Sequence, residues 1–266
     1  MWRKNYLRIL NTITVFCILA GCVINGLRFF GGLAFSFIKT SKAEIVEAEG
    51  DLNPFEKIDA DLSFGSFTVV YGDDYNFSYS GFTPETQPEF NVKGNKLEIK
   101  QKKNINFNIF KDKAGDGKVT VTVPKDSTID MDINLSMGSF ELRDIKTGDL
   151  TLDADMGAIT IKNCDMNDLS IQADMGGITF KDCSFADGEF NANMGGITLK
   201  DCSFRSANCD ADMGSIEVSG DYQELTADCD MGSIKAENNI EAKYDLECDM
   251  GNIKLNGQNK GNEYKN

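Results

Sequence analysis

The sequence predicts an all-β protein: a single-stranded parallel β-helix (β-solenoid) of about 19-residue coils, preceded by one N-terminal transmembrane helix. Two observations predict the solenoid. A Met-Gly pair recurs seven times, with five steps of 19 residues and one of 18, and apolar residues alternate with polar ones between the pairs. The pairs are Met137-Gly138, Met156-Gly157, Met175-Gly176, Met194-Gly195, Met213-Gly214, Met231-Gly232 and Met250-Gly251.

The N-terminal element, residues 1–42, is predicted to be a membrane anchor. Leu7 to Leu27 is a largely apolar stretch of 21 residues, which as a helix is about 31 Å long, enough to cross the hydrocarbon core of a bilayer. Arg3, Lys4 and Arg8 precede this stretch, and basic residues favour the cytoplasmic side. We therefore expect a single-pass cell-membrane protein with an extracellular C-terminal domain.

A lipid anchor is the alternative for the same segment. Leu19 to Cys22 resembles a bacterial lipobox, and cleavage before Cys22 would replace the helix with a diacylated cysteine. Val23 to Phe30 continue the apolar run, whereas the residues after a lipoprotein cysteine are usually polar. The transmembrane helix is favoured, and both anchors tether the domain outside the cell.

Residues 43–53 are predicted to form a polar linker, and residues 54–136 to form irregular first coils of the solenoid. Short runs with alternating apolar residues fill the second segment, separated by turn residues. Leu62 to Phe67 looks like a degenerate copy of Leu135 to Phe140. One continuous solenoid is therefore expected from residue 54 onward.

Residues 137–255 are predicted to form seven 19-residue coils, followed by a polar tail at 256–266. Period-two alternation is typical of strands, and Gly after Met accepts the positive φ of a stacked corner. Apolar columns stand three and five residues after each Met. The first column is Phe140, Ile159, Ile178, Ile197, Ile216, Ile234 and Ile253, and the second is Leu142, Ile161, Phe180, Leu199, Val218, Ala236 and Leu255.

Cysteine and methionine columns are predicted to fill the core. Cys164, Cys183 and Cys202 stand at 19-residue steps, and Cys229 and Cys248 occupy a column that holds alanine in earlier coils. Small apolar residues share these positions, so cysteine is expected to serve as a small hydrophobic residue. The methionines follow two residues after this alanine column, so they too are expected to point inward.

Acidic residues flank the alanine column and are expected to face outward in paired rows. Stacked carboxylates repel one another unless something neutralises them. Calcium is one candidate, because it takes six to eight oxygen ligands, but a solvated turn face is favoured. The weak calcium candidates are Asp210, Asp212, Asp228 and Asp230.

The composition of the chain argues against nucleic-acid binding and against most kinds of catalysis. The chain has a formal net charge of −15, and residues 1–42 hold six basic and no acidic residues, which leaves −21 on the remainder. Such a domain repels nucleic acid. The chain has no His, which removes the usual Ser-His and Cys-His nucleophile pairs and leaves the carboxylate chemistry of carbohydrate-active β-helix enzymes. Because the coils vary by a single residue and carry no long loops, we expect no enzyme and no cofactor.

Several segments carry a resemblance to a known family. The strand Asp61 to Phe67, the turn Gly72 to Asp74, the strand Val119 to Pro124 and the Met-Gly-x-Ile repeats look like the bacterial β-strand-repeat family called "putative adhesins", of unknown function. The likeness covers residues 54–255. It implies a membrane-anchored envelope protein of the kind typical of Gram-positive bacteria, and it supplies no catalytic motif.

The sequence thus predicts a non-catalytic, membrane-tethered cell-surface β-solenoid. It is expected to act as an adhesion, interaction or structural module of the bacterial envelope, held in the membrane by its N-terminal anchor, with an unknown protein or polysaccharide ligand. The alternative is a membrane-linked regulator or sensor of cell-envelope state.

Overall fold

The structure is a computed structural model that describes residues 45–101 and 117–266. The chain divides into two units, Met1–Lys42 and Ala43–Asn266, and every described strand belongs to the second. The expected transmembrane helix and the alternative lipidation site Cys22 lie outside the described residues. In the part of the chain that is described, no helix has the length and apolar character needed to cross a membrane.

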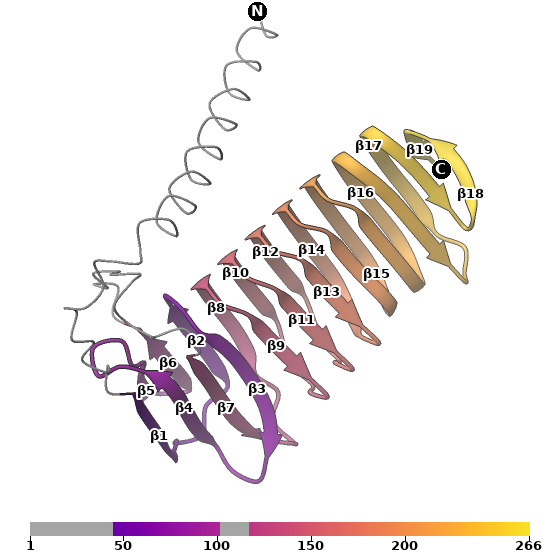
Figure 1. Ribbon diagram of the computed structural model, residues 1–266. Coiled ribbons are helices and arrows are strands. Elements are labelled where there is room, and N and C mark those ends of the chain that lie inside the picture. Colours follow the sequence, from indigo (N-terminus) through magenta and orange to yellow (C-terminus); the bar gives the residue numbers. More distant parts are fainter. Residues whose placement is uncertain (1–44, 102–116) are drawn as a thin grey trace, which may run out of the picture. The chain divides into compact units, whose positions relative to one another are not determined.

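The Met-Gly repeats form a β-solenoid whose coils stack in parallel register (Figure 1). Its strands are β8 (Asp130–Met137), β9 (Phe140–Arg143), β10 (Leu150–Met156), β11 (Ile159–Lys162), β12 (Leu169–Met175), β13 (Ile178–Lys181), β14 (Ser184–Met194), β15 (Ile197–Met213), β16 (Ile216–Asn238) and β17 (Lys243–Leu255). β8 pairs with β10, β10 with β12 and β12 with β14, while β9, β11, β13 and β15 form the neighbouring ladder. The predicted β-solenoid is confirmed.

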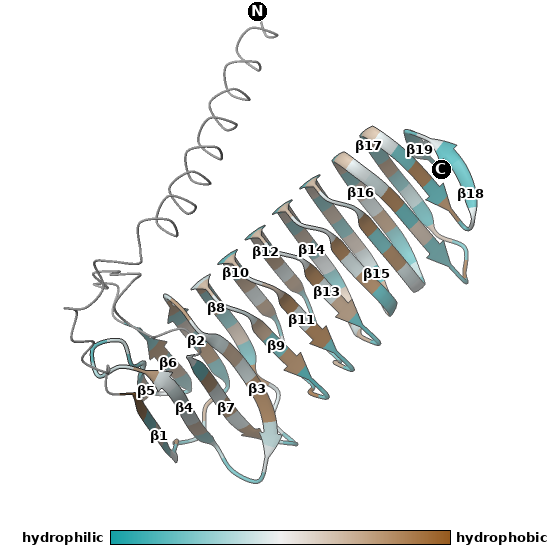
Figure 2. Ribbon diagram, viewed as in Figure 1, coloured by the Kyte–Doolittle hydropathy of each residue, from teal (hydrophilic) through white to brown (hydrophobic). Residues whose placement is uncertain are grey.

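The two predicted apolar columns form the core of the coils. Every residue of the first column is fully buried, and no residue of the second is more than 5% exposed. Figure 2 shows the resulting alternation of apolar and polar residues along the strands. Aromatic residues of successive coils stack as well: the ring of Phe204 lies 4.9 Å from that of Phe185 and 4.8 Å from that of Tyr222. Burial of these columns supplies the hydrophobic stabilisation of the fold.

Glycine is required after each Met because the coils stack there backbone against backbone. A Cβ added to any of the seven glycines would meet the carbonyl oxygen of the glycine one coil earlier, which for Gly138 is Gly65. The predicted positive φ holds for the first four glycines, between 144° and 157°, and is wrong for the other three. Those three are Gly214, Gly232 and Gly251. Close stacking, rather than a left-handed backbone, therefore explains the glycine column.

Six of the seven methionines of the repeat are exposed, so the prediction that they fill the core is wrong for these six, whereas Met137 is half-buried and packs against the core. Met156 is 39% exposed and Met250 is 64% exposed. The parallel register includes Ala154 and Met156 but omits Asp155 between them. Because the chain bends there, two consecutive residues face outward, and burial resumes at Ile159. We call the six exposed methionines the Met stripe: Met156, Met175, Met194, Met213, Met231 and Met250.

Residues 54–136 continue the solenoid, but not in chain order. The strands are β2 (Lys57–Leu62), β3 (Ser66–Gly72), β6 (Lys96–Lys100) and β7 (Lys118–Pro124). β2 pairs with both β6 and β8, and β3 pairs with both β7 and β9. The coil of β2 and β3 therefore lies between a later coil, β6 with β7, and the first Met-Gly coil. Leu62 lies opposite Leu135, and Phe67 lies opposite Phe140, which confirms the degenerate copy.

Antiparallel strands cover both ends of the solenoid. β4 (Asn76–Phe82) pairs with β7 and with β1 (Val46–Asp51), and β5 (Glu89–Lys93) forms a hairpin with β6. A linker was expected over residues 43–53, and this prediction is wrong for the residues of β1. The side chains of β1 are mostly exposed, and the strand is held by backbone pairing with β4. In the expected polar tail, β18 (Gln258–Gly261) and β19 (Glu263–Lys265) pair with β17. Such caps block end-to-end pairing of solenoids.

Candidate functional site

A polar groove of about 660 Å³ crosses successive coils on the corner that follows β11, β13 and the equivalent parts of β15 and β16. The chain turns there at Asn163, Asp182 and Asp201, each with a φ of 53°. Asn and Asp tolerate this left-handed conformation better than other residues with side chains. The amide of Asn163 donates to Asp144 Oδ1 of the preceding coil at 2.8 Å. Stacked Asx residues thus form one wall of the groove.

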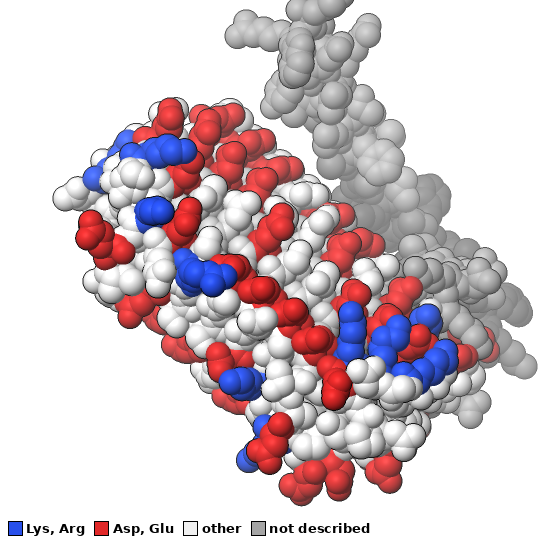
Figure 3. Space-filling view, turned by 180° about the vertical axis from the view of Figure 1, so that it is seen from behind, with Lys and Arg blue, Asp and Glu red and all other residues white. Residues whose placement is uncertain are grey.

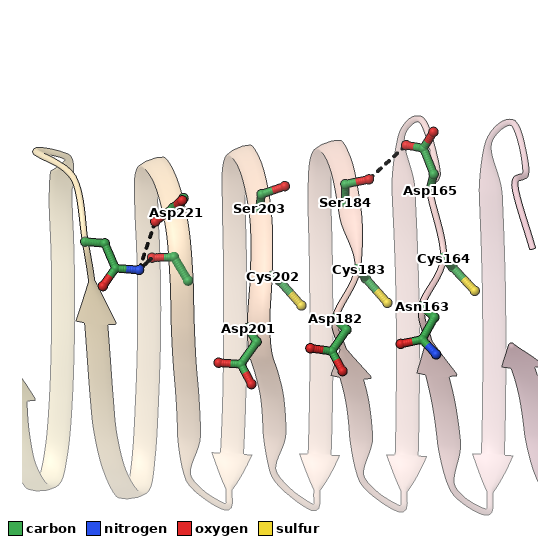
Figure 4. A pocket seen from close by; sticks show the side chains of 12 residues that line it. Asn163, Cys164, Asp165, Asp182, Cys183, Ser184, Asp201, Cys202, Ser203 and Asp221 are labelled. Carbon is green, nitrogen blue, oxygen red and sulfur yellow. Dashed lines mark hydrogen bonds between the residues drawn. The ribbon is translucent and has the colours of Figure 1, made fainter. Parts of the chain in front are cut away.

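Carboxylates and their hydrogen-bond donors form a second polar row in the groove (Figure 4). The hydroxyl of Ser184 donates to Asp165 Oδ1 at 2.9 Å, and Lys146 Nζ lies 3.3 Å from Asp165 Oδ2. The Ser184 hydroxyl, and next Lys146, lower the pKa of Asp165. Further along, the amide of Asn239 donates to Asp221 Oδ1 at 2.9 Å. A carboxyl group with a lowered pKa is ionised at neutral pH and is a poor general acid.

Three thiols of the predicted cysteine column underlie the groove and point the same way in Figure 4. Cys164, Cys183 and Cys202 are free and buried, which confirms that they pack in the coils as small apolar residues. The hydrogen bond with the Cys183 thiol, followed by burial, raises the pKa of both Cys164 and Cys202, while the hydrogen bonds with these two thiols lower the pKa of Cys183. Because the thiolate is the nucleophile and the metal ligand, raised pKa values oppose reactivity at these two positions.

The groove is the feature that the sequence prediction missed. Near-constant coil length predicted coils without long loops, but a groove lies along the left-handed corner without any long loop around it. A signal was present in the repeated Lys-Asx-Cys tripeptide, at Lys162, Lys181 and Lys200. An Asx residue that recurs once per coil marks a stacked left-handed turn.

Two rows of outward-facing polar side chains lie beside the Met stripe, as predicted. We call them the acidic rows. One contains Asp153, Gln172, Asn191, Asp210, Asp228 and Glu247, and the other contains Asp155, Asp174, Asn193, Asp212, Asp230 and Asp249. Burial, and then neighbouring carboxylates, raise the pKa of Asp153 and Asp210. Figure 3 shows how Asp and Glu form rows across successive coils on one face.

The described basic residues do not form ion pairs with the acidic rows. Within residues 45–101 and 117–266, no Lys or Arg forms an ion pair with a carboxylate of these rows. The four calcium candidates, Asp210, Asp212, Asp228 and Asp230, are all exposed in them. Over the same residues, no group of three or more His, Cys, Asp or Glu is arranged to hold a metal ion. A calcium role for the four carboxylates stays a prediction.

The stacked parallel coils, with one corner rich in Asx residues and another bearing the Met stripe, define a β-solenoid. The chain belongs to the Toastrack DUF4097 family, whose model matches residues 67–266. This agrees with the expected membership of a β-strand-repeat family. No curated protein matches the chain significantly.

One solved structure shares the fold, and two others are similar to a lesser degree. A "putative adhesin" from Bacteroides fragilis is 18% identical, with 80% of this chain and 97% of that chain covered and a TM-score of 0.59. A "putative lipid binding protein" from Parabacteroides distasonis is 18% identical, with coverage of 81% and 95% and a TM-score of 0.49. A "putative adhesin" from the same organism is 13% identical, with coverage of 81% and 97% and a TM-score of 0.47. At these identities, the likeness to the Bacteroides fragilis protein shows a shared fold alone.

Proposed function

We propose that the protein is a non-catalytic, membrane-tethered module of the bacterial cell surface that binds a protein or polysaccharide along its solenoid wall. The observation that carries this proposal is the register: each coil presents the same kinds of side chain at the same position as its neighbours. Repeated, aligned side chains suit extended ligands, and solenoids use such walls for binding. The adhesin names of the structural relatives agree with this function.

A non-catalytic role is supported by the chemistry of the groove. A glycosidase needs a carboxylic acid with a raised pKa opposite a second carboxylate. In the groove, the pKa of Asp165 is lowered by the Ser184 hydroxyl and by Lys146. The groove therefore suits hydrogen bonding to a polar ligand better than acid catalysis.

The tether and the topology are tested on intact cells. After removal of the wall, a membrane-impermeant protease should degrade the solenoid, because Arg3, Lys4 and Arg8 favour a cytoplasmic N-terminus. Protection until lysis would place the domain inside the cell and refute the proposal. Palmitate labelling that disappears in Cys22→Ala would identify a lipoprotein anchor in place of a transmembrane helix.

The ligand is sought by cross-linking the protein on intact cells and identifying what is purified with it. Recovery of wall polymer or of a surface ligand supports adhesion. Recovery of a membrane kinase would favour the alternative, a regulator of envelope state tethered by the same anchor.

A further inference from the structure

Neither the stacking of the coils nor the bend at the corner explains why the Met stripe is apolar. Stacking requires the glycines, and the bend at the corner suits the Asx residues before the methionines, but neither requires an apolar side chain between them. In the described part of the chain, six of the eight exposed large hydrophobic residues belong to the stripe. Exposed apolar side chains that gather in one row, rather than singly, mark an interaction surface.

The geometry of the stripe fits a helix that lies along the solenoid axis. Successive methionines are register partners, for example Met194 with Met213 and Met231 with Met250. Register partners in adjacent strands lie about 4.8 Å apart, so the stripe is about 24 Å long. A helix rises about 5.4 Å per turn, and about 16 residues span that length. Such a helix makes about four and a half turns over the five steps between coils, a near match to their spacing, whereas side chains on one face of an extended strand recur at almost 7 Å.

The residues on the two sides of the Met stripe differ, and their charge and size indicate what kind of partner fits this surface. On one side the acidic rows contribute nine carboxylates and three amides. On the other side, the position two residues after each Met holds a small or short polar residue, namely Ala158, Gly177, Gly196, Ser215, Ser233 or Asn252. The flexible apolar side chains of the Met stripe thus lie between the negatively charged acidic rows on one side and a row of small residues on the other. Methionine adapts its shape to varied apolar partners and is frequent at surfaces that bind many of them.

We propose that the Met stripe and the acidic rows form a docking surface for a cationic amphipathic helix. The apolar face of the helix packs on the thioethers, and its Lys or Arg residues face the unpaired carboxylates. This assignment rests on the proposed function as a binding module and names its partner class. The negative charge of the acidic rows argues against two other partners. A second copy of this chain would bring like-charged rows together, and an anionic membrane would be repelled.

The test uses the full-length chain in a non-ionic detergent and three labelled peptides of about 16 residues. The first contains Lys and Leu in amphipathic helical order, the second has the same composition in scrambled order, and the third has Glu in place of Lys. Fluorescence anisotropy should show saturable binding of the first peptide alone. Its affinity should fall as salt is raised, because exposed charges more than about 8 Å apart are screened at physiological ionic strength.

Three variants locate the binding on the stripe. The triple variant Met194→Ser, Met213→Ser, Met231→Ser should weaken binding about tenfold or more, equivalent to about 1.4 kcal/mol. The matched triple variant with Leu at these positions should retain it. Ile240→Ser, which removes an exposed apolar side chain outside the stripe, should change nothing. The melting curve of each variant shows whether the coils remain folded.

The proposal is overturned if the folded chain binds no peptide, if the scrambled peptide binds equally well, or if the serine variant binds like the unchanged chain. The last two results would mean adsorption to the acidic rows alone. Preferential binding to vesicles of anionic lipid would assign the surface to a membrane instead. None of these results bears on the topology, which the protease experiment decides, so the two proposals fail separately.

Discussion

Replacement of Gly214 by Ala should destabilise the solenoid although nothing about its φ forbids a side chain. The backbone of Gly214 lies outside the left-handed region. An added Cβ would nevertheless lie 2.5 Å from the carbonyl carbon of Gly195 and closer still to its oxygen. Backbone atoms cannot rotate away as a side chain can, so the two coils must separate. The Gly195 N–H donates to the Met213 carbonyl oxygen at 3.0 Å between these two coils, and their separation weakens this bond.

The magnitude follows from these two effects. Overpacking against a rigid neighbour costs about 1–3 kcal/mol, and a weakened backbone hydrogen bond costs about 1 kcal/mol. We expect a loss of about 3 kcal/mol in the free energy of unfolding. Gly94→Ala is the matched control, because Gly94 has a φ of 63° and nothing within 4 Å of an added Cβ. There only the left-handed backbone penalty applies, about 1–2 kcal/mol.

Urea unfolding followed by circular dichroism measures both variants. With a urea dependence of about 2 kcal/mol per M, the Gly214→Ala midpoint should lie about 1 M below that of Gly94→Ala. Equal midpoints would refute close stacking as the reason for the glycine column. A lowered slope in Gly214→Ala would mean that the coils on the two sides of the break unfold separately, as a one-dimensional array allows.

The sequence predicted the features that depend on burial. Inward columns such as Ile159 to Ile253 must be apolar in every coil, because a polar side chain there has no partner, so the register of the coils is visible as a period. The same reasoning identified Leu62 to Phe67 as a coil of the solenoid. It also placed the calcium candidates on an outward face, where the structure has them.

The features that the sequence did not predict depend on the path of the backbone. Strict alternation placed Met156 inside, but the register omits Asp155, and one residue outside the register reverses the direction of the next side chain. The exchange of coil order, with β6 and β7 outside β2 and β3, leaves no periodic signal because each coil still buries its own apolar residues. The sequence pattern likewise does not predict β1, because this mostly exposed strand pairs with β4 through backbone hydrogen bonds and needs no apolar side chains.

Three further predictions test the register, the acidic rows and calcium. Ile197→Asp places an unpaired charge at a fully buried position. It should lower the free energy of unfolding by about 3–5 kcal/mol, by analogy with broken buried ion pairs. Ile240→Asp, at an exposed position, should leave the urea midpoint unchanged. Asp210 has a pKa raised by burial and then by its neighbours, so its ionised form destabilises the folded state at neutral pH. The contribution of Asp210 to stability should therefore rise as pH falls from 7 toward its ordinary pKa of 3.8, whereas carboxyl groups with a lowered pKa, such as Asp165, contribute in the opposite direction. Asp210→Asn should melt higher than the unchanged chain at pH 7, and this difference should shrink as pH falls; a difference that stays constant would contradict the assigned cause. Calcium, finally, should stabilise the chain little more than sodium chloride of the same ionic strength, because the acidic rows offer ligands from one face and calcium requires six to eight oxygens around it. Melting temperatures in the two salts decide this. A large rise that only calcium produces, and that Asp212→Asn with Asp230→Asn abolishes, would make the acidic rows a cation site and calcium a competitor for any cationic helix on the Met stripe.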